Sequence, residues 1–138
     1  MPRINRVDHI CIAVEDLERA QRTWAPLLGK ADPDEVYVDE AERIRVARYH
    51  LGEVGFELME STSPDGDVAR FIEHHGEGVM LVSFNVDSTR AAMQELGAAG
   101  YPFIGGARPF RQGEFAFVHP RATHGVLLEY IDDGGAQD

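Results

Sequence analysis

Cysteine, basic residues and long apolar runs are all scarce in this sequence. Cys11 is the single cysteine among 138 residues, so it cannot form an internal disulfide, and we interpret it as a small buried residue of a strand. No apolar run approaches the roughly 20 residues of a membrane span. The N-terminus also lacks the basic and then apolar order of a signal peptide. We therefore expect a cytoplasmic protein with no membrane partner.

The charge is strongly one-sided, with 13 Lys and Arg residues against 24 Asp and Glu residues and a formal net charge of -11. An acidic surface repels phosphate backbones, so we do not expect a nucleic-acid partner. An anionic small molecule can still bind where arginines cluster locally. Hydrophobic residues make up 43% of the chain, which is typical of a globular protein, and the length suits one domain.

The first half of the chain predicts a strand, a helix and three more strands. Residues 7–14 alternate between apolar and other side chains, Asp16 follows as a candidate N-cap, and apolar residues then recur at helical spacing up to Gly29. Further strands are predicted at 35–38, 44–49 and 54–59, and a short helix at about 68–75.

The second half repeats this order. Strands are predicted at 80–86, 101–104, 114–119 and 126–131, with a helix that begins after Ser88. One offset aligns both ends of the two halves, because Asp16 matches Ser88 (88 − 16 = 72) and Glu57 matches Glu129 (129 − 57 = 72). Such agreement indicates an internal duplication.

We therefore predict an α+β fold in which two tandem βαβββ repeats form a curved mixed sheet around a central cleft. A single domain is expected over residues 1–138. It comprises repeat one at about 4–60, a linker helix at about 66–76 and repeat two at about 79–132.

Three ionisable residues interrupt the apolar strands: His9, Glu57 and Glu129. A buried carboxylate is costly unless it is paired or binds a cation, and two at equivalent positions indicate a shared role. The position equivalent to His9 is 81 (9 + 72 = 81), which is Leu81. Taken singly, His9 could be a hydrogen-bonded core residue and the glutamates could be solvated. Together, the three residues favour a divalent metal site.

The same segments resemble the vicinal oxygen chelate superfamily, which includes glyoxalase I and methylmalonyl-CoA epimerase. The resemblance covers about residues 4–131 and is closest to the epimerase branch. The segment VDHICIAVEDLERA resembles its opening strand and helix, GFELMESTSPDGDVARFIEHHGEG its linker, and FVHPRATHGVLLEYI its closing hairpin.

The resemblance implies a site for a divalent ion such as Co, Mn, Zn, Ni or Mg. Its metal ligands correspond to His9, Glu57 and Glu129, whereas Leu81 stands where the family has a histidine ligand. The proton-transfer carboxylates of the epimerases correspond to Glu129 and, by a looser alignment, Glu35. Other histidines that could supply the missing ligand are His50, His74, His75 and His124; we interpret His74 and His75 as residues of a helix end.

Substrate contacts are expected from Leu81 and from two arginines, Arg108 and Arg111, in a predicted loop at 105–113. These arginines could bind an anionic substrate group or could simply be solvated. A second arginine set, Arg43, Arg45 and Arg48, is interpreted as an exposed sheet face. The resemblance also implies a small-molecule substrate, such as a CoA thioester or a related oxygenated acid, and a homodimer.

Two functions remain open from the sequence. The first is a metal-dependent, epimerase-like isomerase or lyase that acts by enolate-stabilised proton transfer. The second is a metal-free small-molecule binding protein of the bleomycin-resistance type. Leu81 favours the second function, whereas His9, Glu57 and Glu129 together favour the first, which we expect.

Overall fold

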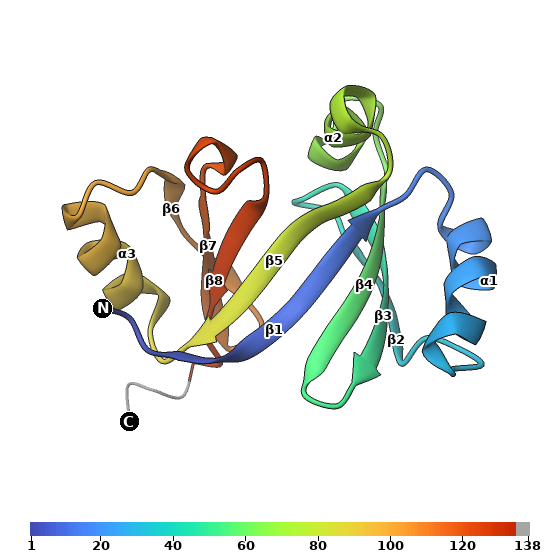
Figure 1. Cartoon of the computed structure of the whole chain (residues 1–138), viewed down its shortest axis with the longest axis horizontal. Helices are drawn as coiled ribbons and strands as arrows, with labels where there is room; N and C mark the ends of the chain where they lie inside the picture. The colour runs from blue at the N-terminus through green and yellow to red at the C-terminus, as the bar shows by residue number, and fades with distance from the viewer. Residues whose placement is uncertain (135–138) are drawn as a thin grey trace. The chain divides into compact units, whose positions relative to one another are not determined.

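The structure, a computed structural model, describes residues 1–134 and contains the predicted βαβββ order twice (Figure 1). The elements of the first repeat are β1 (Ile4–Ala13), α1 (Leu17–Leu28), β2 (Glu35–Asp39), β3 (Ile44–Leu51) and β4 (Val54–Ser61). After α2 (Asp67–His75) come β5 (Gly78–Val86), α3 (Thr89–Ala98), β6 (Phe103–Phe110), β7 (Gly113–Val118), the short 3-10 helix η1 (Pro120–Ala122) and β8 (Leu127–Ile131). Within residues 1–134, every helix is too short or too polar to cross a membrane.

The strands form a mixed sheet in the order β2-β3-β4-β1-β5-β8-β7-β6. Strands β5 and β8 run parallel, whereas β3 is antiparallel to β2 and β4, and β7 is antiparallel to β6 and β8. The α+β class and the two βαβββ repeats are therefore confirmed.

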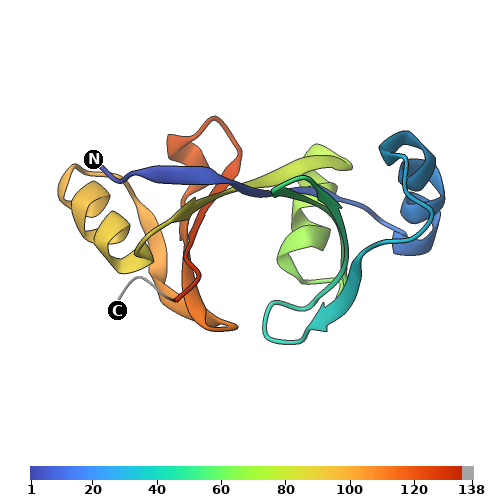
Figure 2. The same cartoon turned by 90° about the horizontal axis from the view of Figure 1, so that it is seen from below.

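The chain divides into two compact units that do not coincide with the two repeats. Unit 1 comprises Met1–His9 and the chain from Leu81 onward, and unit 2 comprises Ile10–Met80. Strands β1 and β5 therefore each contribute residues to both units. In unit 2, α1 packs on β3 and β4, and in unit 1, α3 packs beside β6, β7 and β8 (Figures 1 and 2).

Each unit has an apolar core between its helix and its strands. In unit 2, Leu17 of α1 packs with Tyr49 and Leu58, and Trp24 lies 5.0 Å from Phe56 between ring centroids. The core of unit 1 contains the buried residues Val86, Ala92, Val118 and Tyr130. Each core therefore packs the helix of its unit against strands of the same unit.

The predicted N-caps are present in both repeats. Asp16 Oδ1 accepts a hydrogen bond from the backbone N–H of Arg19 at 3.0 Å, and Ser88 Oγ accepts one from Ala91 at 3.1 Å. Gly29 ends α1 with a φ of 69°, a left-handed conformation that favours glycine. The sequence therefore predicted the ends of these elements correctly.

A second pair of capping carboxylates extends the duplication. The backbone N–H of Leu17 donates to Glu60 Oε1 at 3.0 Å, and that of Thr89 donates to Asp132 Oδ2 at 2.9 Å. Both the donors (89 − 17 = 72) and the acceptors (132 − 60 = 72) keep the offset between the repeats. The sequence analysis missed these contacts, although both carboxylates follow Glu57 and Glu129 by three residues.

The predicted loop at 105–113 is wrong. Strand β6 continues to Phe110, so Arg108 lies on a strand opposite Phe115, and only Arg111 lies in the turn to β7. The pairing shifts between Ile104 and Arg108, where Gly105 has a φ of 66°. This irregularity explains the error, because glycines at a bulge resemble loop glycines in a sequence.

Candidate functional site

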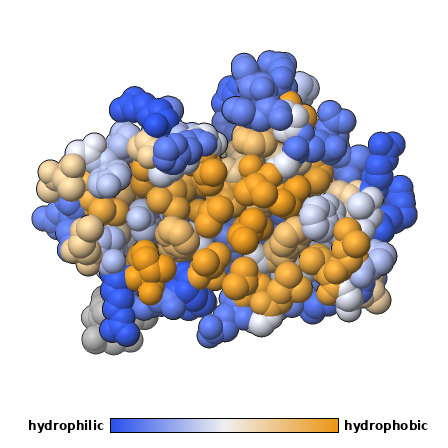
Figure 3. Space-filling model, viewed as in Figure 1, coloured by the Kyte–Doolittle hydropathy of each residue, from blue (hydrophilic) through white to orange (hydrophobic). Residues whose placement is uncertain are grey.

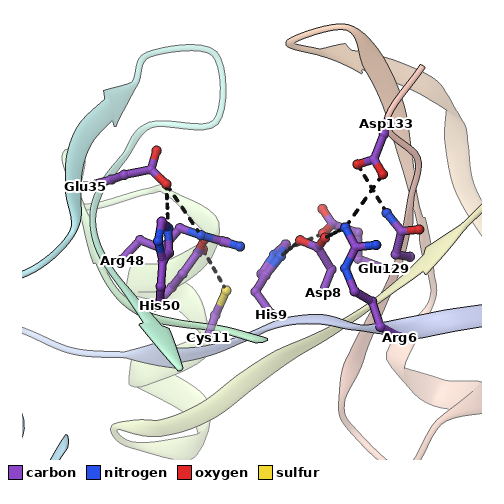
Figure 4. A network of polar contacts seen from close by, with 11 residues as sticks. Arg6, Asp8, His9, Cys11, Glu35, Arg48, His50, Glu129 and Asp133 are labelled. Carbon is purple, nitrogen blue, oxygen red and sulfur yellow. Dashed lines mark hydrogen bonds and ion pairs between the residues drawn. The ribbon is translucent and has the colours of Figure 1, made fainter. Parts of the chain in front are cut away.

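His9 and Glu129 form a buried pair in unit 1. His9 lies on β1 and Glu129 on β8, with residue exposures of 8% and 6%. Their side chains point toward each other, with 3.1 Å between His9 Nε2 and Glu129 Oε1 (Figure 4). Two of the three ionisable residues that the sequence singled out are therefore brought together.

Asp8 fixes the orientation of the His9 ring. Asp8 Oδ2 lies 2.8 Å from His9 Nδ1, and Arg6 NH2 lies 3.4 Å from the other Asp8 oxygen (Figure 4). Because a carboxylate only accepts hydrogen bonds, it selects the tautomer that carries the proton on Nδ1. A neutral His9 then presents the Nε2 lone pair toward Glu129. The sequence analysis missed Asp8, because neighbouring residues of a strand normally point to opposite faces.

The meeting of two acceptors creates a place for a cation. Glu129 Oε1 is buried and accepts no hydrogen bond within residues 1–134, although His9 Nε2 lies nearby. Two ligand atoms at right angles, each about 2.1 Å from an ion, are about 3.0 Å apart, close to the distance between Nε2 and Oε1. A carboxylate behind a metal-binding histidine is a recurrent arrangement. The residues of unit 1 therefore fit a divalent ion.

Neutral side chains flank Glu129 on the neighbouring strands. Ser83 of β5 and Phe117 of β7 are its register partners, and Leu81 lies two residues before Ser83 on β5. Leu81 is 5% exposed, and Ser83 Oγ is buried without a hydrogen bond within residues 1–134. The register partners of Glu129 on both neighbouring strands are therefore uncharged.

Glu57 of unit 2 has a different environment. It lies on β4 and is 3% exposed. Its Oε2 atom is 2.5 Å from Arg48 NH1, and its Oε1 atom accepts a hydrogen bond from Cys11 Sγ at 3.3 Å. Both oxygens of this carboxylate are therefore engaged by side chains of the same unit.

The predicted exposed arginine face is wrong for Arg48. Its side chain is 19% exposed, against 44% for Arg45, which lies 3.6 Å from Glu60. Residues three apart on a strand point to opposite faces, so Arg45 and Arg48 cannot share one. Counting by twos along β3 would have found this difference from the sequence.

Glu35 belongs to the same charged group as Arg48. The register places Glu35, Arg48 and Glu57 opposite one another on β2, β3 and β4. Glu35 Oε2 lies 3.7 Å from Arg48 Nε and 2.9 Å from His50 Nε2 (Figure 4). The candidate proton-transfer residue Glu35 therefore contacts two basic side chains.

The remaining histidines have contacts of their own. His74 Nδ1 and His75 Nδ1 lie 2.8 Å and 3.2 Å from carbonyl oxygens of Arg70 and Phe71 in the same helix. Both are in the last turn of α2, as interpreted from the sequence. His124 has a φ of 58°, in the turn that precedes β8.

Arg108 and Arg111 lie against phenylalanine rings of unit 1. The Arg108 guanidinium carbon is 6.0 Å from the ring centroid of Phe115 and 5.6 Å from that of Phe117. Arg111 lies 5.1 Å from the Phe110 centroid. These distances are typical of cation–π contacts. Phe117, one of the rings beside Arg108, is also the register partner of Glu129.

Comparison with known proteins gives both the fold and the family. The chain is 33% identical to an uncharacterised protein, YqjC, of Bacillus subtilis (strain 168), covering 97% of this chain and 96% of that protein. It is 28% identical to the mitochondrial methylmalonyl-CoA epimerase of Homo sapiens, covering 91% of this chain and 73% of that protein. A solved methylmalonyl-CoA epimerase, in complex with methylmalonyl-CoA and NH4+, superposes with a TM-score of 0.87 at 25% identity, covering 97% and 98% of the two chains.

The relatives with a named activity are thus enzymes of the isomerase class, in agreement with the expected epimerase-like enzyme. The model of the Glyoxalase/Bleomycin resistance protein/Dioxygenase superfamily matches residues 8–117. This match covers most of the chain, including β1, β4 and the strands of the second repeat up to β7. The protein belongs to the Glyoxalase/Bleomycin resistance protein/Dioxygenase superfamily.

Proposed function

We propose that the protein is a metal-dependent isomerase. It would remove and return a proton at the α-carbon of an acyl thioester or of a related oxygenated acid. The observation that carries this proposal is the His9–Glu129 pair, with Asp8 behind the histidine. Support also comes from the methylmalonyl-CoA epimerases among the relatives. A lyase that begins with the same proton removal fits the same residues.

His9 and Glu129 are the proposed ligands of the ion in unit 1, and Glu57 is the proposed third ligand. When bound, a divalent ion would supply positive charge where negative charge develops on a substrate oxygen. Leu81 cannot contribute a ligand atom, so we expect this chain to bind the ion less tightly than a site with a second histidine. The candidate ions are Co, Mn, Zn, Ni and Mg.

Glu129 and Glu35 are the proposed proton-transfer residues. A carboxylate takes the α-proton of the substrate, and a second carboxylic acid returns a proton to the same carbon. Glu129 is buried between its register partners Ser83 and Phe117, with His9 Nε2 3.1 Å from its Oε1 atom. Glu35 contacts His50 Nε2, which can hold a second proton beside it.

Arg108 and Arg111 are the proposed contacts for an anionic part of the substrate, such as a carboxylate or the phosphates of a CoA thioester. Both guanidinium groups lie against phenylalanine rings, which restrict their positions. Leu81 and Phe117 would contact the apolar part of the acyl group. A CoA thioester is supported by the relative that was solved with methylmalonyl-CoA.

A homodimer is the proposed assembly, and a single domain in the cytoplasm remains the expectation from the sequence. Figure 3 shows hydrophobic residues on the viewed face of each unit, over β1 and β5. The exposed apolar side chains of these strands are Ile4, at 42%, and Val79, at 51%. Apolar surface of this kind is typical of protein interfaces.

A metal-free binding protein is the second candidate. The observation that favours it is the Arg48–Glu57 ion pair, since it neutralises one of the proposed metal ligands without an ion. Leu81 favours the same alternative. The Asp8–His9–Glu129 arrangement favours the first candidate, because a neutral His9 and the Glu129 carboxylate present two acceptor atoms to which a cation can bind.

Proton exchange tests the proposed function. Methylmalonyl-CoA is incubated with the protein in D₂O, and loss of the α-proton signal is followed by NMR with added Co²⁺ and with a chelator. We expect exchange that depends on the ion and on Glu129. Absence of exchange for methylmalonyl-CoA, while the protein still binds this thioester, would favour the binding-protein alternative.

A further inference from the structure

Arg48 forms an ion pair with Glu57, one of the proposed metal ligands. Its guanidinium lies between two carboxylates, 2.5 Å from Glu57 Oε2 and 3.7 Å from Glu35 Oε2. The three residues are register partners across β2, β3 and β4, so the strands themselves hold them in one row. This row carries a positive charge in the middle and a negative charge at each end.

Gly55 makes room for the guanidinium. A Cβ atom added at Gly55 would collide with Cζ and both terminal nitrogens of Arg48. No positive φ is recorded at Gly55, so its backbone conformation does not demand glycine. A glycine at position 55 is therefore explained by the Arg48 guanidinium, which occupies the space that a side chain would fill.

We propose that Arg48 is an internal cation that competes with the divalent ion for Glu57. The inference rests on the proposed metal-dependent function. It names Arg48 as a residue that determines the affinity of the protein for the ion. A buried carboxylate that is already neutralised gains less from an ion than an unpaired one. The carboxylate of Glu57 is therefore available to an ion only when the Arg48 guanidinium moves away.

The test compares metal binding by chelator-treated variants, measured by calorimetric titration with Co²⁺ and with Mn²⁺. Arg48→Met removes the competing charge and should tighten binding by about 5- to 150-fold. Gly55→Ala keeps every charge but displaces the guanidinium, and should shift the affinity in the same direction by a smaller factor. This second variant keeps the test decisive if Arg48→Met does not fold.

Two controls define the source of the effect. Arg45→Met removes the same charge from the same strand but from the other face, and should change the affinity by less than about twofold. Adding Glu57→Gln to Arg48→Met should abolish the gain, because the carboxylate that the ion would use is then gone. A gain that survives Glu57→Gln would overturn the inference.

The outcomes separate this inference from the proposed function. Equal metal affinity in the wild type, Arg48→Met and Gly55→Ala would overturn competition by Arg48 while leaving a metal-dependent enzyme in place. Metal binding by Arg48→Met but not by the wild type would support the competition and contradict a metal-dependent wild-type enzyme. No binding by any of the variants would overturn both.

Discussion

Glu57 and Glu129 occupy equivalent positions of the two repeats, yet their charges are compensated in different ways. Opposite Glu57 on the neighbouring strand stands Arg48, whereas opposite Glu129 stands Phe117. Unit 2 therefore contains the cation that its carboxylate needs. In unit 1, His9 lies beside Glu129 and could compensate its charge. The Nε2 atom of His9 carries a proton only when the ring is charged.

The difference extends to the positions around each carboxylate. Gly55, which makes room for Arg48, corresponds to Leu127 in the second repeat (127 − 55 = 72). Cys11, which donates to Glu57, corresponds to Ser83 (83 − 11 = 72), whose buried hydroxyl has no hydrogen bond within residues 1–134. A duplicated fold can thus keep its acidic positions while one repeat places an arginine opposite the carboxylate and the other does not.

The largest expected effect comes from removing the carboxylate of unit 1. Glu129→Gln should lower α-proton exchange by about 10²- to 10⁴-fold, because the variant cannot accept a proton. Glu57→Gln should lower it by a smaller factor, since Arg48 already engages that carboxylate. Both rates are measured by NMR in D₂O, with Glu114→Gln, which removes a carboxylate paired with Arg90, as the control. Equal losses for Glu57→Gln and Glu129→Gln would remove the asymmetry between the units.

A smaller effect is expected from the residue behind the histidine. Asp8→Asn should weaken metal binding by about 10- to 100-fold, because an amide holds the ring orientation and its basicity less well than a carboxylate. Calorimetric titration with Co²⁺ gives the affinity. Asp87→Asn serves as a matched change, since Asp87 accepts a hydrogen bond from Asn5 of the same unit. Unchanged affinity in Asp8→Asn would mean that His9 does not act through Asp8.

The Leu81→His variant places a histidine, which can bind a metal, at the position of the second repeat that is equivalent to His9. Leu81 lies on the same strand as Ser83 and shares its face, next to Glu129. We expect metal binding to tighten by about tenfold, or about 1.4 kcal/mol. The thermal unfolding temperature should also respond more strongly to Co²⁺ than in the wild type. If added metal affects Leu81→His and the wild type equally, position 81 does not face the ion.

The smallest effects are expected at the two helix N-caps, Asp16 and Ser88. They occupy equivalent positions of the two repeats and lie outside the candidate site. Ser88→Ala should cost about 1 kcal/mol of unfolding free energy at any pH. The backbone N–H of Arg19 lowers the pKa of Asp16 below its usual value of 3.8. A lowered pKa stabilises the fold above 3.8, and this stabilisation is lost as the pH falls through the folded value. Urea unfolding at pH 7 and pH 3 should therefore show a smaller loss for Asp16→Ala at the lower pH, and equal losses would contradict this assignment.

Much of the fold follows from patterns of short range. Alternation in residues 7–14, the caps Asp16 and Ser88 and the stop at Gly29 each depend on a few neighbouring residues, and each is found in the structure. The 72-residue offset then extends these local patterns to both repeats (88 − 16 = 72). His9, Glu57 and Glu129 were also found from a local pattern, because each is an ionisable residue within an apolar strand.

What the sequence analysis missed depends on contacts between strands. The role of Arg48 requires the β3–β4 register and the space over Gly55, neither of which is visible in β3 alone. The contact of Asp8 with His9 Nδ1 depends on how two adjacent side chains turn. Arg108 was assigned to a loop because a bulge in β6 carries glycines. In each case the missing information is three-dimensional geometry that the order of residue types along one strand does not give.

The most direct test of the central claim is a calorimetric titration of the chelator-treated wild-type protein with Co²⁺, repeated with His9→Ala. We expect each chain to bind one ion, binding to raise the thermal unfolding temperature, and His9→Ala to lose both effects. A wild-type protein that takes up no ion and shows no change in unfolding temperature would contradict it.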